Sequence, residues 1–133
     1  VLQRLGSTRA LTVFGREGLD EISISGQTLV GELKDGRVSE YEIHPEQFNL
    51  PVHDPKVLQV ANVEESKIML LGALENKLGA ARDIVALNAG ASIYVCGLAE
   101  TLADGVEQAF EMIASGAARA KVDEFVACTK RFS

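Results

Sequence analysis

The sequence predicts an α/β protein in which part of a mixed sheet, including a β-hairpin, is followed by four helices. Two observations support this fold class. Residues 8–44 contain short runs rich in β-branched and aromatic residues, which are separated by glycines and are typical of strands. From residue 62 onward, the apolar residues recur at helical spacing. The 133 residues contain no internal repeat and no linker-like segment, so they are interpreted as one domain.

The chain begins with a pattern that is typical of the last turns of a helix. Val1, Leu2 and Leu5 keep helical spacing, and Gly6 is a residue type favoured just past a helix C-terminus. Because the sequence also lacks an initiator methionine, we expect a fragment of a longer protein. The next segment, residues 8–14, is short, β-rich and bounded by glycines, which predicts a buried strand.

A β-hairpin is predicted around the pair Asp35 and Gly36, which lies between strand-like runs at residues 27–34 and 37–44. An Asp-Gly pair favours a type I′ turn, because that turn needs positive φ at both central positions. The turn also sets the register of the two strands. Two cross-strand pairs follow from it, Leu33 with Val38 and Val30 with Tyr41. Pro45 then ends the second strand and is suited to begin a short helical turn.

The first two helices are predicted after the proline-punctuated segment 51–55. Asn62, with Glu65 three residues later, resembles a capping box, so we expect the first helix to begin there. Residues 80–97 are apolar almost all round, which predicts a helix buried inside a larger domain. Asn88 lies within this apolar helix and needs hydrogen-bond partners, for which we expect the backbone of a neighbouring element.

The last two helices follow a second candidate capping pair, Thr101 with Asp104. The third helix carries an apolar stripe of Val106, Phe110 and Ile113 that we expect to be buried. The fourth helix is expected to direct its apolar residues inward and its charged residues outward. These are Val122, Phe125 and Val126 on the inner side, and Lys121, Asp123 and Glu124 on the outer side.

The composition argues against a membrane protein, a strongly basic nucleic-acid-binding protein and a disulfide-stabilised protein. Hydrophobic residues make up 47% of the chain, but no stretch approaches the roughly 18 consecutive apolar residues of a membrane helix. The formal net charge of −6 argues against a nucleic-acid-binding protein that relies on bulk electrostatics. Cys96 and Cys128 make no disulfide framework, and Cys96 is expected to fill the core. With reduced cysteines and no signal-peptide pattern, we predict a cytoplasmic protein.

Asp20 and Glu21 are the candidate metal ligands. They lie in the run Gly18-Leu19-Asp20-Glu21-Ile22-Ser23, at the exit of the first predicted strand. In open α/β sheets, ligands bind at that end of the strands. One or two carboxylates, completed by water and phosphate oxygens, are what Mg²⁺ usually takes from a protein. Adjacent acidic residues in loops are most often solvated charge, so the rest of the sequence has to decide between the two interpretations.

Other candidate groups are better explained by structure than by function. Lys77 and Arg82 could offer cations to a phosphate at a helix N-terminus, but we favour the interpretation that Arg82 and Asp83 cap the helix start while Gly79 turns the chain. His44 and His53 have no companion at metal-ligand spacing and are interpreted as surface loop histidines. No glycine-rich phosphate loop, Cys-x-x-Cys pair or Ser/His/Asp order can be assembled.

Three longer segments occur in a distinctive order. They are GREGLDEISISGQTLVGELKDGRVSEYEIHPEQFNLP, NKLGAARDIVALNAGASIYVCG and TLADGVEQAFEMIASGAA. Together they closely resemble the C-terminal part of the bacterial anthranilate phosphoribosyltransferase family, from about Leu2 to about Val126. The GLDEIS motif alone also occurs in related nucleoside-phosphorylase-type enzymes, but its combination with the other two segments is much more specific.

The resemblance implies that the full-length enzyme transfers the phosphoribosyl group of phosphoribosyl pyrophosphate to the amine of anthranilate, in tryptophan biosynthesis. It also implies that Asp20 and Glu21 hold Mg²⁺ that engages the pyrophosphate. The chemistry agrees, because a hard cation prefers oxygen ligands and neutralises charge on a leaving pyrophosphate.

Family members are much longer than this chain. Residues 1–133 correspond to a C-terminal fragment of the glycosyltransferase-family α/β domain. The N-terminal helical domain, the glycine-rich phosphate-binding loop and the residues that grip anthranilate are absent. We therefore expect no catalytic residue in this chain, and we expect the isolated chain to be inactive.

Three alternatives remain open at this point. One is a related pentosyl-transferring phosphorylase that uses another acceptor. Another is a non-enzymatic member of the same fold that binds nucleic acid, which a basic groove would support. The third is a proteolytic remnant. In each case, the loss of upstream strands would leave an apolar strand edge unpaired, so we expect self-association of the isolated chain.

Overall fold

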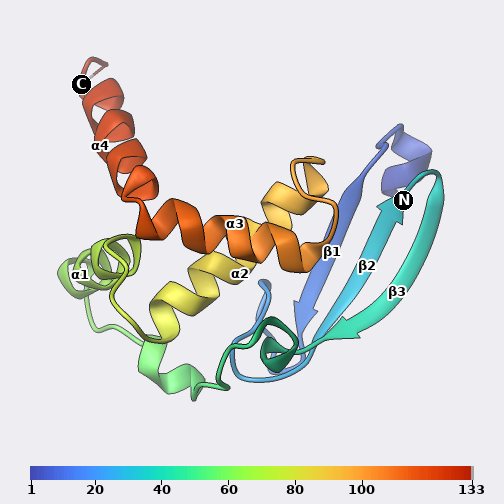
Figure 1. The fold of residues 1–133 in the computed structure, drawn as a ribbon, viewed down its shortest axis with the longest axis horizontal. Helices are drawn as coiled ribbons and strands as arrows, with labels where there is room; N and C mark the ends of the chain where they lie inside the picture. The colour runs from blue at the N-terminus through green and yellow to red at the C-terminus, as the bar shows by residue number, and fades with distance from the viewer. Residues whose placement is uncertain (133) are drawn as a thin grey trace.

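A three-stranded sheet lies at one side of the molecule, and helices α2 and α3 cross each other beside it (Figure 1). This computed structural model describes residues 1–132. Its strands are β1 (Ala10–Gly15), β2 (Thr28–Lys34) and β3 (Arg37–Ile43). Its helices are α1 (Val63–Leu74), α2 (Ala80–Val95), α3 (Leu102–Ala114) and α4 (Ala117–Thr129), with short 3₁₀ helices η1 (Leu2–Leu5), η2 (Pro45–Phe48) and η3 (Pro55–Leu58). No helix among the described residues is long and apolar enough to cross a membrane.

The predicted hairpin is confirmed. Strands β2 and β3 are joined by Asp35 and Gly36, whose φ angles of 50° and 71° are those of a type I′ turn. Leu33 pairs with Val38 and Val30 pairs with Tyr41, as predicted. The first predicted strand is present as β1, but the prediction that it is buried is wrong. Only Gly15 in it is buried, and Phe14 is 52% exposed, because β1 lies at the edge of the sheet. The helical turn before β1 is present as the 3₁₀ helix η1, which ends at Leu5 and is followed by Gly6 with a φ of 92°.

The α/β fold class is confirmed, but the strand pairing differs from the mixed sheet that we predicted. The strand order is β1-β2-β3, and both neighbouring pairs are antiparallel. Parallel neighbours need a long crossover connection, which is usually a helix. The connection between β1 and β2, residues 16–27, contains no helix. Residues 1–132 therefore contain no parallel pair.

Helices α2 and α3 pack with their backbones almost in contact. A Cβ atom added to Gly90 of α2 would lie 2.5 Å from the Cα atom of Val106 in α3. One added to Gly105 of α3 would lie 2.4 Å from the carbonyl oxygen of Gly90. The crossing therefore needs glycine at both positions. The main hydrophobic core lies next to this helix crossing. It includes the buried residues Ile22, Ile24, Val30, Ile43 and Leu87.

The predicted capping box of α3 is confirmed, whereas that of α1 forms in one direction only, because the Glu65 carboxylate accepts from the N–H of Ala61 instead of Asn62. The Asn62 side chain accepts a hydrogen bond from the N–H of Glu65, at the start of α1. At the start of α3, the N–H of Asp104 donates to the Thr101 hydroxyl, and the N–H of Thr101 donates to the Asp104 carboxylate. Both distances in this reciprocal pair are 3.1 Å. The sequence therefore located these two helix starts correctly.

Two predictions about buried apolar residues are wrong. Val106 and Ile113 of α3 are buried as expected, but Phe110 is only partly buried. Phe125 and Val126 of α4 are exposed, at 67% and 41% of their surface. The reason is that α4 projects away from the sheet and from α2 (Figure 1), so no residue of this helix is buried.

The prediction that Cys96 fills the core is also wrong. Helix α2 ends at Val95, and Cys96 follows at the turn that leads into Gly97. The residue therefore lies past the end of the helix and is exposed. Cys128 is exposed as well, and neither cysteine is in a disulfide.

Candidate metal site

Asp20 and Glu21 lie in the loop that follows β1, as the sequence predicts. The loop turns tightly at its start. The N–H of Gly15 donates to the carbonyl of Leu19 at 2.8 Å, and the N–H of Gly18 donates back to the carbonyl of Gly15 at 2.8 Å. Gly18 has a φ of 96°, a conformation that glycine adopts readily and other residues do not. The turn places both carboxylates close to the end of the strand.

The two carboxylates are available to a ligand. Both residues are exposed, and neither side chain forms a hydrogen bond or an ion pair with any of residues 1–132. Carboxylate oxygens suit a hard divalent cation such as Mg²⁺. Among the described residues, however, no three His, Cys, Asp or Glu side chains are grouped to hold a metal ion. The pair can therefore supply only part of a coordination shell, and water or ligand oxygens have to supply the rest.

Helix α2 holds the residue that follows the acidic pair. The Oδ1 atom of Asn88 accepts a hydrogen bond from the N–H of Ile22 at 2.9 Å, and its Nδ2 atom donates to the Ile22 carbonyl at 3.1 Å. The same Nδ2 atom donates to the carbonyl of Ile84, one turn earlier in α2, at 3.0 Å. This confirms the prediction that Asn88 finds its partners on the backbone of a neighbouring element.

A third carboxylate in the loop, Glu17, was missed by the sequence analysis. Its Oε1 atom accepts hydrogen bonds from the hydroxyl groups of Ser23 and Ser25. Burial raises the pKa of Glu17, but the hydrogen bonds from the Ser23 and Ser25 hydroxyls and from its own backbone N–H together outweigh that effect, so the pKa lies below the ordinary value of a glutamate. The signal in the sequence was the alternation of these serines with Ile22 and Ile24. Ser23 itself is buried, at 1% exposure, so its hydroxyl needs a partner inside the fold.

His53 is not the free surface histidine that we predicted. Its backbone N–H donates to the carbonyl of Ile24 at 2.9 Å. Its Nε2 atom lies 2.9 Å from Oδ2 of Asp83, whose side chain is only 3% exposed. Because His53 and Asp83 are 30 positions apart in the sequence, no local pattern indicated the contact.

Neither role considered for Arg82 is supported. Helix α2 begins after Gly79 without a hydrogen bond from a capping side chain, so the prediction that Arg82 and Asp83 cap the helix is wrong. The Arg82 guanidinium donates to the second Asp83 oxygen at 3.0 and 3.2 Å and lies over the ring of Phe110, 5.0 Å from its centroid. It is therefore already paired. Lys77 forms no ion pair with another described residue.

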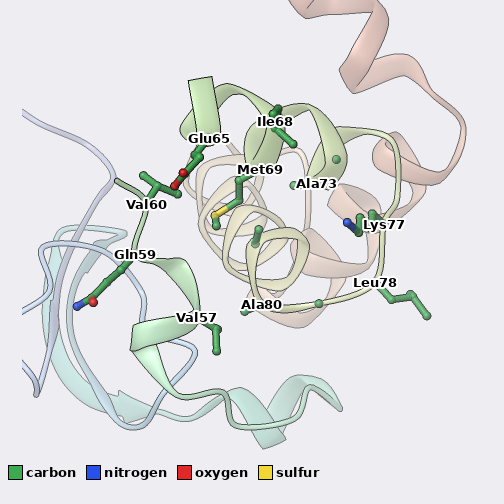
Figure 2. A pocket seen from close by; sticks show the side chains of 13 residues that line it. Val57, Gln59, Val60, Glu65, Ile68, Met69, Ala73, Lys77, Leu78 and Ala80 are labelled. Atoms are coloured by element: carbon green, nitrogen blue, oxygen red, sulfur yellow. The ribbon is translucent and has the colours of Figure 1, made fainter. Parts of the chain in front are cut away.

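A separate cavity of about 420 Å³ opens between η3, α1 and the connection to α2 (Figure 2). Most of its lining is apolar, and Figure 2 shows Met69 on its wall with Glu65 and Lys77 on opposite sides. None of residues 16–27 lines it, so it is distinct from the acidic loop.

Comparison with known proteins shows the family of this chain. Residues 1–119 match the model of the glycosyl transferase family, a/b domain. The chain belongs to this family. It is 56% identical over 132 residues to the anthranilate phosphoribosyltransferase of Burkholderia ambifaria and 55% identical to that of Burkholderia multivorans. These matches cover 99% of the chain, which spans only 38% of the length of these curated relatives.

Solved structures agree with the fold. The crystal structure of anthranilate phosphoribosyltransferase from Thermus thermophilus matches with a TM-score of 0.83 and 34% identity, over 95% of this chain and 37% of that one. The enzyme from Saccharomyces cerevisiae, solved in complex with PRPP and Mg, matches with a TM-score of 0.76 and 22% identity, over 90% and 34%. The resemblance to anthranilate phosphoribosyltransferases is thereby confirmed.

Proposed function

We propose that the full-length protein carrying this chain transfers the phosphoribosyl group of phosphoribosyl pyrophosphate to the amine of anthranilate, as a step of tryptophan biosynthesis. The observation that carries this proposal is the 56% identity to a curated anthranilate phosphoribosyltransferase over 99% of the chain. The anthranilate phosphoribosyltransferases described above support anthranilate as the acceptor. They argue against the alternative of a related phosphorylase that uses another acceptor. We also propose that the protein is cytoplasmic, on the basis of its free cysteines and its composition.

Within this reaction, Asp20 and Glu21 bind Mg²⁺, directly or through water. The geometry supports the assignment because both carboxylates lie exposed at the exit of β1 and have no partner among residues 1–132. Mg²⁺ usually keeps several waters and takes one or two protein carboxylates plus substrate phosphates, which fits a site with two protein ligands. When bound, the ion neutralises charge that develops on the leaving pyrophosphate.

The isolated chain does not catalyse this transfer. It spans 38% of the length of its curated relatives, and its acidic pair supplies only part of a metal shell. By the resemblance to the family, the glycine-rich phosphate-binding loop and the residues that grip anthranilate lie outside this chain.

The test is to combine Asp20→Asn with Glu21→Gln in the full-length enzyme and to titrate Mg²⁺ against turnover. Both changes keep the side-chain shape at exposed positions, so the folded structure is retained. We expect the Mg²⁺ concentration for half-maximal turnover to rise about 10-fold or more, since the charged ligands are lost. The matched control is Glu107→Gln with Glu111→Gln, which removes two exposed negative charges from α3. An unchanged Mg²⁺ requirement in the double loop variant would refute the metal assignment.

A further inference from the structure

The Asn88 amide holds Ile22 with a fixed orientation. Its Oδ1 atom faces the Ile22 N–H, and its Nδ2 atom faces the carbonyls of Ile22 and Ile84, at distances of 2.9, 3.1 and 3.0 Å. A flipped amide would set a donor against a donor and an acceptor against both carbonyls, so only one orientation satisfies all three groups. The bond to Ile84 ties the amide to its own helix, and the two bonds to Ile22 tie the loop to that amide.

The Ile22 N–H belongs to the peptide group that joins Glu21 to Ile22. Fixing this N–H fixes the plane of that peptide group, because the peptide bond is planar. The plane in turn restricts the direction of the Glu21 side chain. Ile22 is also held through its own side chain, which is only 2% exposed in the main core. The backbone on the C-terminal side of the acidic pair is therefore immobilised by α2.

We propose that Asn88 is a positioning residue for the metal-binding carboxylates Asp20 and Glu21. This inference rests on the proposed function of that pair. The two carboxylates make no contact that would orient them within residues 1–132. Their direction is set by the loop backbone, which the Gly15–Leu19 hydrogen bond holds before the pair and Asn88 holds after it.

A Mg²⁺ site depends more than most metal sites on carboxylates whose orientation is fixed. Mg²⁺ demands near-ideal octahedral geometry at short distances and gives up its waters reluctantly. Groups that orient metal ligands without touching the metal typically change metal affinity by one to two orders of magnitude when removed. Asn88 does not touch the metal or the substrate in this proposal, and its effect is transmitted through the peptide group between Glu21 and Ile22.

The experiment measures metal binding directly, in the full-length enzyme with phosphoribosyl pyrophosphate present. Mn²⁺ replaces Mg²⁺ as the probe, because its free and bound forms are distinguished by electron paramagnetic resonance. Asn88→Ala removes all three hydrogen bonds. Asn88→Ser keeps a hydroxyl that can bond back to Ile84 in the same helix but is too short to hold Ile22, so it serves if the alanine variant fails to fold.

The matched control is Tyr94→Phe in the same helix. It removes a hydroxyl that donates to Glu32 of β2 at 2.5 Å, so it also cuts a tie between α2 and the sheet, but away from the acidic loop. We expect the Asn88 variants to bind Mn²⁺ about 10-fold more weakly. The control is expected to bind it normally, and the KM for anthranilate is expected to change less than about twofold in all three variants.

Hydrogen exchange supplies a readout that does not depend on activity. The Ile22 amide should lose protection in both Asn88 variants and keep it in Tyr94→Phe, because within residues 1–132 its N–H donates to Asn88 and to no other residue. Normal Mn²⁺ affinity in a folded Asn88 variant would overturn the inference, and so would equal weakening in the Tyr94→Phe control. The combined Asp20→Asn and Glu21→Gln variant separates the two proposals. If this variant binds Mn²⁺ normally, the proposed metal site is refuted. If this variant binds Mn²⁺ weakly while the Asn88 variants bind it normally, the metal site is supported and only the positioning role of Asn88 is refuted.

Discussion

The backbone contact between α2 and α3 makes Gly90→Ala a direct test of the packing. The added methyl group would lie 2.5 Å from Cα and 2.6 Å from N of Val106, well inside van der Waals contact. Backbone atoms cannot rotate away as a flexible side chain can, so relief requires one helix to move by about 1 Å. Overpacking of this kind costs about 1–3 kcal/mol, and the clash with backbone places this case at the upper end.

Alanine also favours a helix over glycine by about 1 kcal/mol, which offsets part of the clash. The net expectation for Gly90→Ala is a loss of about 2 kcal/mol in the free energy of unfolding. Gly72→Ala in α1 is the matched control. A Cβ atom at Gly72 would meet only the flexible side chain of Lys77, at 3.5 Å, which is ordinary contact. The same substitution is therefore expected to stabilise the chain there by up to about 1 kcal/mol.

Urea unfolding of the wild type and both variants, followed by circular dichroism, measures the two effects. With a slope of about 2 kcal/mol per molar urea, Gly90→Ala should lower the midpoint by about 1 M and Gly72→Ala should raise it slightly. The opposite signs distinguish the clash from any general preference of these helices for alanine. A midpoint for Gly90→Ala equal to or above that of the wild type would refute the close crossing of α2 and α3.

Two further predictions concern the loop and the sheet. Because the pKa of Glu17 lies below its ordinary value, ionised Glu17 stabilises the folded state above about pH 4.3, and this contribution is lost as the pH falls through the folded-state pKa. Glu17→Gln should therefore weaken the acid dependence of the urea midpoint, and an unchanged dependence would contradict this. The isolated chain should also self-associate as its concentration rises, because β1 has an unpaired edge and Phe14, Leu29 and Val38 are exposed on one face of the sheet. Sedimentation velocity measures this, and a single monomeric species at high concentration would disprove it.

Features that depend on neighbours in the sequence were predicted well. The hairpin turn depends on φ at Asp35 and Gly36 alone, and the start of α3 depends on the three-residue spacing of Thr101 and Asp104. The position of the acidic pair was predictable for the same reason, since it follows directly from the end of β1. These elements needed no knowledge of how the chain packs.

Features that depend on packing were predicted poorly. Contact between His53 and Asp83 requires a loop and a helix to meet, and neither segment carries a sign of the other. The exposure of Phe125 in α4 was missed because an amphipathic pattern shows which face of a helix is apolar, but not whether another element covers that face. The role of Glu17 was hidden because its partners, Ser23 and Ser25, lie across a loop.

The hydrogen bonds between Asn88 and Ile22 also determine when the acidic loop becomes ordered during folding. The two residues are 66 positions apart, whereas the hairpin closes over a two-residue turn. Contacts of large sequence separation form late, because the entropy of closing the chain must be overcome first. During synthesis Asp20 and Glu21 leave the ribosome well before α2 does, and the backbone that follows them stays unanchored until that helix docks. A mutation that delays the docking of α2 therefore yields a finished hairpin beside an acidic loop that has no defined direction.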